Sequence, residues 1–397
     1  MRERHPIKSL PRQSPRNVGT ENNGYHSPPP PDMDTEWSEF DIACMRRALE
    51  VAEHGRGQVS PNPPVGCVLT RNGKIIAIGW HDHLGDLHAE QAAIANAEKL
   101  GVTTEGCTAY VTLEPCNHFG RTPPCTQALL WAGVQEVIVA TRDPNPTVRG
   151  EGIQVLLDAG ITVREGLLQE DAQTQMQAFM HWCECKRPLV TLKAAMDANG
   201  VVDGKTPGRF TSEESLTGAH RLRRECDAIL VGVNTIIRDD PSLNIRRVSG
   251  GKRKQPLRVV LDRTLRIPPD AKVLNDGEET ILVHIQPDSR GVALPAGDGG
   301  ADLNALLDHL GDRGIQELLV EGGPIVWKQF LDEGLVDRAI IIQSDIELGD
   351  GPESGIDDQR ISNAGLEIVG HLDWGGDSVT LWSRPDLPLP SPNWLSH

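Results

Sequence analysis

The spacing of apolar residues predicts alternating helices and strands in the first half of the chain. Apolar residues recur at helical spacing from Ile42 to Ala52. Ser38, with Asp41 three residues later, resembles a capping box, so a helix is expected to begin near Trp37 and to stop at Gly55. Alternating or β-branched runs predict strands at residues 65–70, 75–81, 109–113, 137–141 and 161–163. Further helices are expected at residues 87–100 and 152–159, with Asn72-Gly73 forming the turn of a β-hairpin.

The second half shows the same alternation, and no internal repeat relates it to the first. Strands are expected at residues 189–195, 228–233, 257–261, 280–284, 317–320 and 338–343. Thr211, with Glu214 three residues later, predicts a helix reaching Glu225, and further helices fit residues 303–310 and 325–333. Residues 234–246 form a polar segment. The pattern therefore predicts α/β structure in domains at residues 36–166 and 188–390, joined by a connecting helix or linker at 167–187.

Residues 1–35 have a different composition, with seven prolines and almost no clustered apolar residues. Such a segment cannot bury a core, so it is expected to be a disordered extension. Its basic first half raises the alternative of an organelle-targeting segment. Glu3 and Glu21 interrupt that charge and no amphipathic helix is evident, so a disordered extension is favoured over a transit peptide.

Composition excludes several classes of protein. The net charge of −17 argues against nucleic-acid binding through a broad basic face, and no apolar run reaches membrane-spanning length. The eight cysteines are scattered and no secretory signal is present, which indicates a reducing compartment, the cytoplasm, rather than a disulfide scaffold. We expect four cysteines to be packing residues and leave Cys183 and Cys185 unassigned. The four are Cys44, Cys67, Cys107 and Cys226.

A short set of residues in the first half supplies what a catalytic zinc site needs. His88-Ala89-Glu90 is followed by Pro115-Cys116 and then by Cys125. Three nitrogen and sulfur ligands, here His88, Cys116 and Cys125, leave a fourth zinc position open for water. Glu90 is then the carboxylate that moves protons, as in nucleobase-type deaminases. Taken singly, each residue is more simply a surface histidine or a buried thiol, but their occurrence together and in this order favours zinc.

Helix starts are expected to position these ligands. Asp86 can cap the helix at residues 87–100, which places His88 in its first turn. Thr122 can cap a second helix that begins with Pro123-Pro124 and ends at Gly133, which places Cys125 in a first turn too. The positive end of a helix favours the thiolate that binds metal.

The motifs resemble those of a known family. Eight residues separate the two cysteines, and the run 113–125 (LEPCNHFGRTPPC) is similar to the signature of the riboflavin-biosynthesis deaminases, as are residues 61–66, 79–81 and 143–146. The second half resembles the reductase domain of the same enzymes in residues 227–232, Thr235, 239–246, 256–262 and 321–324. The resemblance covers residues 37–385. It implies a cytidine-deaminase-like zinc domain followed by a dihydrofolate-reductase-like α/β domain.

The family's chemistry is then expected here. One Zn²⁺ in the deaminase domain would support hydrolytic deamination of 2,5-diamino-6-ribosylamino-4(3H)-pyrimidinone 5′-phosphate, with Glu90 carrying the proton. NADPH would then deliver hydride to ribosyl C1′ and open the sugar to a ribityl chain, early in riboflavin biosynthesis. The family also suggests a homo-oligomer, while the charge and the lack of a long apolar run predict no nucleic-acid or membrane partner.

The resemblance also assigns binding residues. Asn62 and His81 would hold the base in the deaminase, although each could equally be a turn or packing residue. The residues assigned to the reductase substrate are Lys193, Arg223, Leu243, Arg246 and Glu321. Those assigned to NADPH are Ala195, Thr235, Asp239, Gly323, Pro324 and Ile325. Without the resemblance, the arginines would be surface salt-bridge partners, Asp239 a turn cap and Gly-Gly-Pro an ordinary turn.

Two departures from the family pattern leave rival interpretations open. Asn199 stands where a carboxylate is usual, and Arg209-Phe210 replaces a tryptophan and an isoleucine; Arg209 could instead pair with the 2′-phosphate of NADPH. In one rival, the second domain is degenerate and only binds ligand or a partner. In the other, the zinc domain edits tRNA or free nucleosides, which the acidic charge and the cysteine spacing oppose.

Overall fold

A computed structural model describes residues 37–119, 123–145, 151–204, 208–249, 251–252, 254–287, 290–297, 300–390 and 395. The extension expected at residues 1–35 and the cap expected at Thr122 lie outside these residues. In the part of the chain that is described, no helix is both long and apolar enough to cross a lipid bilayer.

The first sheet has five strands. Its spatial order is β2 (Lys74–Trp80), β1 (Gly66–Arg71), β3 (Thr108–Leu113), β4 (Glu136–Thr141) and β5 (Thr162–Glu165). The hairpin β1–β2 and the pair β1–β3 are antiparallel, whereas β3, β4 and β5 run parallel. Strands β3 and β4 are almost wholly buried, as expected for strands covered on both faces.

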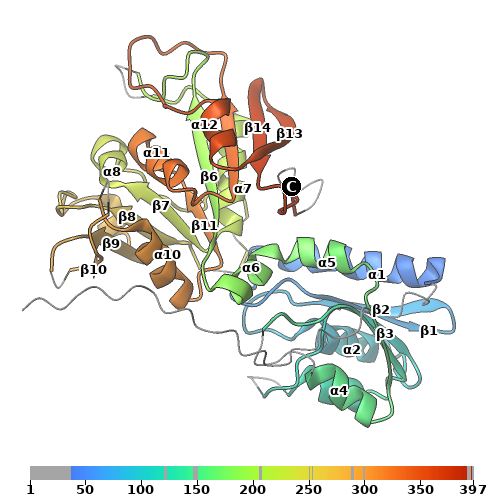
Figure 1. Ribbon diagram of the computed structural model, residues 1–397. Coiled ribbons are helices and arrows are strands. Elements are labelled where there is room, and N and C mark those ends of the chain that lie inside the picture. Colours follow the sequence, from blue (N-terminus) through green and yellow to red (C-terminus); the bar gives the residue numbers. More distant parts are fainter. Residues whose placement is uncertain are drawn as a thin grey trace, which may run out of the picture. The chain divides into compact units, whose positions relative to one another are not determined.

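Helices cover both faces of this sheet (Figure 1). One core cluster joins the sheet to α1 (Glu39–Ala52), α5 (Gln169–Gln175) and α6 (Gln177–Cys185). The cluster on the other face joins it to α2 (Ala89–Lys99), α3 (Cys125–Trp131) and α4 (Glu151–Asp158). A 3₁₀ turn at Glu53–Gly55 follows α1. The result is an α/β/α sandwich with α2 and α3 on one face.

Two local predictions in this half are confirmed and two are wrong. The helix expected to begin with Pro123-Pro124 begins at Cys125 instead, and Pro124 is its N-cap residue. Ser38 and Asp41 form the expected capping box, and Asn72 and Gly73 have the positive φ angles, 50° and 67°, of a tight hairpin turn. Asp86, however, does not cap α2. Its carboxylate accepts a hydrogen bond from the neighbouring Leu87 N–H, and His88 is the N-cap residue, so the helix begins two residues later than predicted.

Gly79 sets how closely β2 approaches α2. A Cβ built at this position would lie 2.2 Å from the Ala93 nitrogen and 2.5 Å from the Ala89 oxygen. We therefore expect Gly79→Ala to lower the free energy of unfolding by about 1–3 kcal/mol, because the helix that carries His88 must shift. Urea unfolding followed by tryptophan fluorescence measures this change.

Gly370→Ala is the matched control for Gly79→Ala. Gly370 also lies in a strand, but a Cβ there meets only the tip of Leu381, at an ordinary 3.6 Å. Its free energy of unfolding should stay within about 0.5 kcal/mol of the unaltered protein. If the two substitutions lower the free energy of unfolding equally, the close approach of β2 to α2 is not the cause of the loss.

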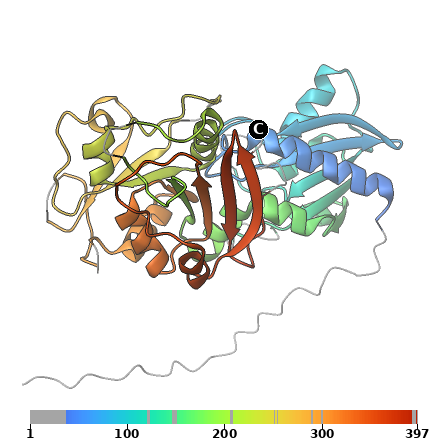
Figure 2. The same cartoon turned by 90° about the horizontal axis from the view of Figure 1, so that it is seen from above.

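The second sheet has nine strands. Its spatial order is β10 (Val292–Ala293), β9 (Thr280–His284), β8 (Leu257–Leu261), β7 (Ala228–Gly232), β11 (Glu317–Val320), β6 (Leu189–Met196), β12 (Arg338–Gln343), β14 (Asp377–Ser383) and β13 (Glu367–Trp374). The strands from β10 to β12 are parallel, and β14 and β13 add an antiparallel edge. Figure 2 shows these last two strands, in red, side by side.

Helices also cover both faces of the second sheet. Buried residues of α10 (Leu303–Asp312), α11 (Pro324–Asp332) and α12 (Asp358–Asn363) belong to one core cluster. Those of α7 (Glu213–Glu225), α8 (Val233–Asp239) and α9 (Lys272–Asn275) belong to the other. The carboxyl ends of the parallel strands thus meet at one edge, where ligands bind in open α/β sheets.

The sequence predictions for this half need three corrections. The N-cap of α7 is Ser212, not Thr211, because the Ser212 hydroxyl accepts the Ser215 N–H. Helix α8 begins at Val233 and takes up the first part of the polar segment 234–246, and the connection at 167–187 contains two helices rather than one. The four cysteines predicted as packing residues are all buried, as is Cys183, whereas Cys185 is exposed.

Candidate functional sites

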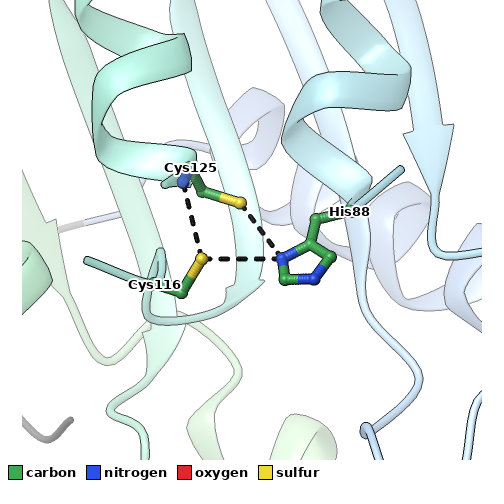
Figure 3. Close-up of side chains that lie close together, drawn as sticks. All are labelled: His88, Cys116 and Cys125. Atoms are coloured by element: carbon green, nitrogen blue, oxygen red, sulfur yellow. Dashed lines mark hydrogen bonds between the residues drawn. The ribbon is translucent and has the colours of Figure 1, made fainter. Parts of the chain in front are cut away.

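The three predicted zinc ligands lie together (Figure 3). His88 is the N-cap of α2, Cys116 follows β3, and Cys125 is the first residue of α3. The His88 Nδ1 lies 3.5 Å from the Cys116 Sγ and 3.4 Å from the Cys125 Sγ. Zn–N and Zn–S bonds of usual length at tetrahedral angles place nitrogen and sulfur roughly 3.6 Å apart. The donor set and its spacing therefore fit a zinc ion.

The two thiols differ in acidity. The Cys125 N–H, at the start of α3, lies 3.4 Å from the Cys116 Sγ and donates to it. Hydrogen bonds from Cys125 and His88 lower the pKa of Cys116 well below that of an ordinary thiol. A side-chain hydrogen bond between the Cys125 thiol and Cys116, together with burial, raises the pKa of Cys125. One thiolate is thus stabilised before any metal binds, and a bound cation would favour ionisation of the second.

Glu90 lies beside these ligands in the first turn of α2 and is only 3% exposed. Burial raises the pKa of its carboxyl, and the neighbouring Cys116 raises it further. A raised pKa makes the Glu90 carboxylate a stronger base, which favours a general acid–base role.

Glu114 is a supporting residue that the sequence analysis missed. Its buried carboxylate accepts hydrogen bonds from the backbone N–H groups of Asp143, Gly152 and Ile153, and so ties the start of the Cys116 loop to α4. A Cβ at Gly152 would lie 1.9 Å from the Pro115 oxygen, so only glycine allows this approach. From the Leu-Glu-Pro-Cys run alone, Glu114 could not be distinguished from an exposed acidic residue.

Asn62 and His81, the two residues predicted to hold the base, are in contact. The Asn62 Nδ2 lies 3.1 Å from the His81 Nε2, and the His81 Nδ1 lies 2.9 Å from the Leu87 oxygen. A carbonyl only accepts, so Nδ1 carries the proton and Nε2 accepts from Asn62. Burial lowers the pKa of His81, which keeps the ring neutral. Both ring nitrogens have protein partners, and the ring packs edge-on against His88 with centroids 5.2 Å apart.

A charged cluster lies at the carboxyl end of β11. The Arg223 guanidinium forms two parallel hydrogen bonds with the Glu321 carboxylate, Nε–Oε1 at 2.6 Å and Nη2–Oε2 at 2.8 Å. Burial alone would raise the pKa of Glu321, but Arg223 holds it below its usual value. Burial lowers the pKa of Lys193, whose ammonium also interacts with the charges of Glu321 and Arg223. Three of the five predicted substrate contacts in the second domain are therefore brought together.

The other two predicted contacts lie in the segment after α8. Leu243 is buried, with a positive φ of 47°, and Arg246 donates its backbone N–H to the His220 Nδ1. Burial lowers the pKa of Arg246, and the positive charge of Arg223 lowers it further. Two arginines and a lysine around one carboxylate can accept a phosphorylated substrate.

A pocket of about 350 Å³ opens between the ends of β7, β8 and β11. Four of the six predicted cofactor contacts line it: Thr235, Gly323, Pro324 and Ile325. Gly323 is the N-cap of α11, Pro324 is at its first position, and a Cβ at Gly323 would meet nothing within 4 Å. The other two do not line the pocket. Ala195 is half-buried within β6, and Asp239 is an exposed residue at the end of α8.

The structure also places the residues that depart from the family pattern. Asn199 is exposed, and its N–H donates to Asp197, whose carboxylate also accepts from Val201 and Leu348. Arg209 pairs with Glu213 and does not line the pocket, so it is not placed to meet a cofactor phosphate there.

Family models match both halves of the chain. The model of the cytidine and deoxycytidylate deaminase zinc-binding region matches residues 38–141. The model of the RibD C-terminal domain matches residues 188–380. The zinc cluster lies within the first match, and the charged cluster and the pocket lie within the second.

Relatives match across most of the chain. The riboflavin biosynthesis protein RibD of Aquifex aeolicus is 40% identical over 326 residues, which is 80% of this chain and 90% of that protein. RibD of Escherichia coli is 36% identical over 316 residues, which is 75% of this chain and 85% of that protein. The structure of a Thermotoga maritima diaminohydroxyphosphoribosylaminopyrimidine deaminase/5-amino-6-(5-phosphoribosylamino)uracil reductase has a TM-score of 0.76 at 32% identity and covers 87% of this chain and 99% of that one. The structure of Acinetobacter baumannii RibD has a TM-score of 0.77 at 32% identity and covers 87% of this chain and 98% of that one.

Proposed function

Because the chain belongs to the RibD family of riboflavin-biosynthesis proteins, we propose specific roles for its residues in the two reactions of that family. The protein is a bifunctional enzyme, a zinc-dependent deaminase and an NADPH-dependent reductase. Its deaminase acts on 2,5-diamino-6-ribosylamino-4(3H)-pyrimidinone 5′-phosphate, and its reductase then converts the ribosyl group to a ribityl chain. The domain boundaries we propose are 36–166 and 188–390, joined by 167–187.

His88, Cys116 and Cys125 hold the zinc ion, and their mutual spacing is the observation that carries this assignment. When bound, zinc supplies the Lewis acidity that lowers the pKa of a water molecule. Glu90 would accept a proton from the attacking water, whose oxygen bonds to the carbon that bears the amine. Glu90 then returns the proton to the nitrogen, so that the carbon–nitrogen bond breaks and ammonia leaves. The buried position of Glu90 keeps its carboxyl able to do both.

Asn62 and His81 position the pyrimidine. Because the His81 Nε2 fixes the Asn62 amide nitrogen, the amide oxygen of Asn62 is the group that accepts from the base. His81 acts through Asn62 and does not itself contact the substrate.

Loss of one zinc ligand tests the metal site. Cys125→Ser is expected to reduce bound zinc from about one ion per chain to near zero and to abolish deamination, since hydroxyl oxygen replaces the thiolate that zinc prefers. Metal analysis of the purified protein and an ammonia-release assay measure the two effects. Cys185→Ser, at an exposed cysteine outside the site, should change neither. Full zinc content in Cys125→Ser would contradict the ligand assignment.

In the reductase domain, the charged cluster binds the substrate and the pocket binds the cofactor. Arg223 and Arg246 hold the substrate phosphate, and Glu321 orients Arg223 and accepts from the substrate. The residues that line the pocket would hold NADPH, and the backbone N–H groups at the start of α11 would bind its phosphates. When bound, NADPH would supply the hydride that replaces the bond from C1′ to the ring oxygen, and that oxygen would need a proton. Lys193 is the donor that we assign to it.

The rival interpretations are less well supported. A degenerate second domain is not favoured, because Lys193, Arg223 and Glu321 form one cluster and Asn199 and Arg209 lie outside the pocket. Editing of tRNA or free nucleosides is not favoured in a chain that carries the reductase domain as well. We also propose a homo-oligomeric enzyme that works in the cytoplasm, where its zinc cysteines stay reduced.

A further inference from the structure

The loop that carries Asn62 is bound by a residue of the reductase domain. This loop, residues 56–65, joins the 3₁₀ turn after α1 to β1. The buried side chain of Gln316, the residue before β11, donates from Nε2 to the Pro61 oxygen at 2.7 Å. The two partners are 255 positions apart in the sequence. A residue of one domain therefore fixes the backbone next to a residue that we assign to the substrate of the other.

Gln316 is itself held firmly by the second sheet. Its N–H donates to the Asp227 carboxylate at 2.9 Å, and its oxygen accepts the Leu189 N–H at 2.8 Å. Asp227 precedes β7, and Leu189 is the first residue of β6. Gln316 is thus tied to the amino ends of the two strands that flank β11, and its amide gives the loop a fixed point of attachment.

Two further contacts join the beginning of the loop to the reductase domain. A Cβ at Gly57 would lie 2.5 Å from the Arg224 oxygen in the last turn of α7. The Gln58 Oε1 accepts the Lys252 N–H at 2.9 Å. Both contacts precede Asn62 in the chain, whereas the Gln316 hydrogen bond is made to the residue next to Asn62.

Close packing does not hold the loop on the side that faces Gln316. A cavity of about 60 Å³ lies there, and its lining residues include Asn62, Pro63 and Pro64 of the loop and Gln316 and Glu317 of the reductase domain. This volume is larger than one water molecule needs. Without the Gln316 hydrogen bond the loop can shift into this space, which a close-packed contact would prevent.

We propose that Gln316, in the reductase domain, is a positioning residue for deamination, because it holds the Pro61 backbone so that the Asn62 amide meets the pyrimidine. The proposal rests on the assignment of Asn62 to the base. The His81 Nε2 fixes the Asn62 side chain at 3.1 Å, and Gln316 fixes the backbone beside it. A hydrogen bond to the base requires a defined distance and angle. The geometry of the deaminase site then depends on the reductase domain.

Gln316→Met tests the proposal in the full-length, zinc-loaded protein. Methionine has nearly the length of glutamine but cannot donate a hydrogen bond. The KM for deamination should rise about tenfold, since contact with the base is weakened in the ground state and the transition state alike. The kcat should stay within about twofold and zinc at about one ion per chain, because Glu90 and the metal ligands are unchanged. Ammonia release, metal analysis and NADPH oxidation measure these values.

Gln343→Met is the matched control for Gln316→Met. Gln343 also donates from Nε2 to a backbone oxygen, that of Ala198 at 3.3 Å, but within the reductase domain. Its replacement should leave the KM for deamination within about twofold. If Gln316→Met gives the same KM for deamination as this control, the loop is held without Gln316 and the proposal is wrong. If Gln316→Met raises the KM for the deaminated intermediate equally, it disturbs the reductase domain as a whole, and the proposal is again wrong.

Asn62→Ala separates failure of the proposal from failure of the role given to Asn62. It removes the amide itself and should raise the KM for deamination at least as much as Gln316→Met. In the double variant, Gln316→Met should add less than about twofold, because the group that it positions is already absent. If the two effects multiply instead, Gln316 acts independently of Asn62 and the proposal is wrong. If Asn62→Ala leaves the KM unchanged, Asn62 does not bind the base and the proposal falls with that assignment.

Discussion

Replacing Glu90 with glutamine is expected to slow deamination by about 10³-fold. The amide has nearly the same shape, so it can fill the buried position in the first turn of α2, but it cannot take a proton from water or return one to the amine. Because Glu90 is not a ligand, zinc should remain at about one ion per chain. Reductase activity on the deaminated intermediate should be unchanged.

Glu98→Gln is the matched control for Glu90→Gln. Glu98 lies on the same helix but is exposed, so its replacement should leave deamination within about twofold. An ammonia-release assay and metal analysis of all three proteins give the comparison. Near-normal deamination by a zinc-loaded Glu90→Gln protein would show that another group moves the proton.

Lys193→Met is expected to slow the reductase by about 10²–10³-fold while deamination stays unchanged. Burial lowers the pKa of Lys193, so its ammonium gives up a proton more readily to the ring oxygen as the sugar opens. Methionine matches the length of lysine without a proton to donate, and it removes a charge that burial disfavours. The loss should therefore lie mainly in kcat and not in the KM for NADPH.

A comparison at Lys272 isolates this effect from a general loss of positive charge. Lys272 is an exposed lysine of α9 that pairs with Asp240, and Lys272→Met should leave both activities within about twofold. NADPH oxidation measured with the deaminated intermediate gives kcat and KM for each variant. If Lys193→Met raises the KM for the deaminated intermediate and leaves kcat unchanged, Lys193 binds substrate and does not transfer the proton.

Metal ligands were more predictable from sequence than the elements that carry them. His88, Cys116 and Cys125 could be recognised because few other functions need those residue types in that order. The start of α2 could not be recognised, because an aspartate before a helical pattern can either cap the helix or accept a hydrogen bond from the N–H of the next residue. Asp86 does the second, and the extended backbone of His88 (φ −69°, ψ 163°) delays the helix to Ala89.

In the second sheet, the parallel strands were predicted better than the antiparallel edge. The strands at residues 257–261, 280–284, 317–320 and 338–343 have the predicted bounds because parallel, doubly covered strands are continuous apolar runs. Strands β13 and β14 were both missed: β13 is mostly exposed and forms the sheet edge, whereas β14 is largely buried but pairs in an antiparallel way at that edge. Helix α8 was missed because seven residues are too few to establish a helical period.

Pairings between distant residues needed the structure. The resemblance assigned Arg223 and Glu321 separately to the substrate, but their bidentate ion pair joins residues 98 positions apart. The same holds for Glu114, whose three backbone partners lie beyond β4. Ala195 and Asp239, assigned to the cofactor by position in sequence, do not line the pocket, whereas Arg263 and Arg266, which sequence analysis did not single out, do.

The most direct test of two active sites in one chain is a mass spectrum of the products. The zinc-loaded protein would be incubated with 2,5-diamino-6-ribosylamino-4(3H)-pyrimidinone 5′-phosphate and NADPH. Our account predicts a product in which oxygen has replaced the amine and two hydrogens have been added. A product with the amine replaced but no added hydrogen would contradict the reductase assignment, and unchanged substrate from folded, zinc-bound protein would contradict the central claim.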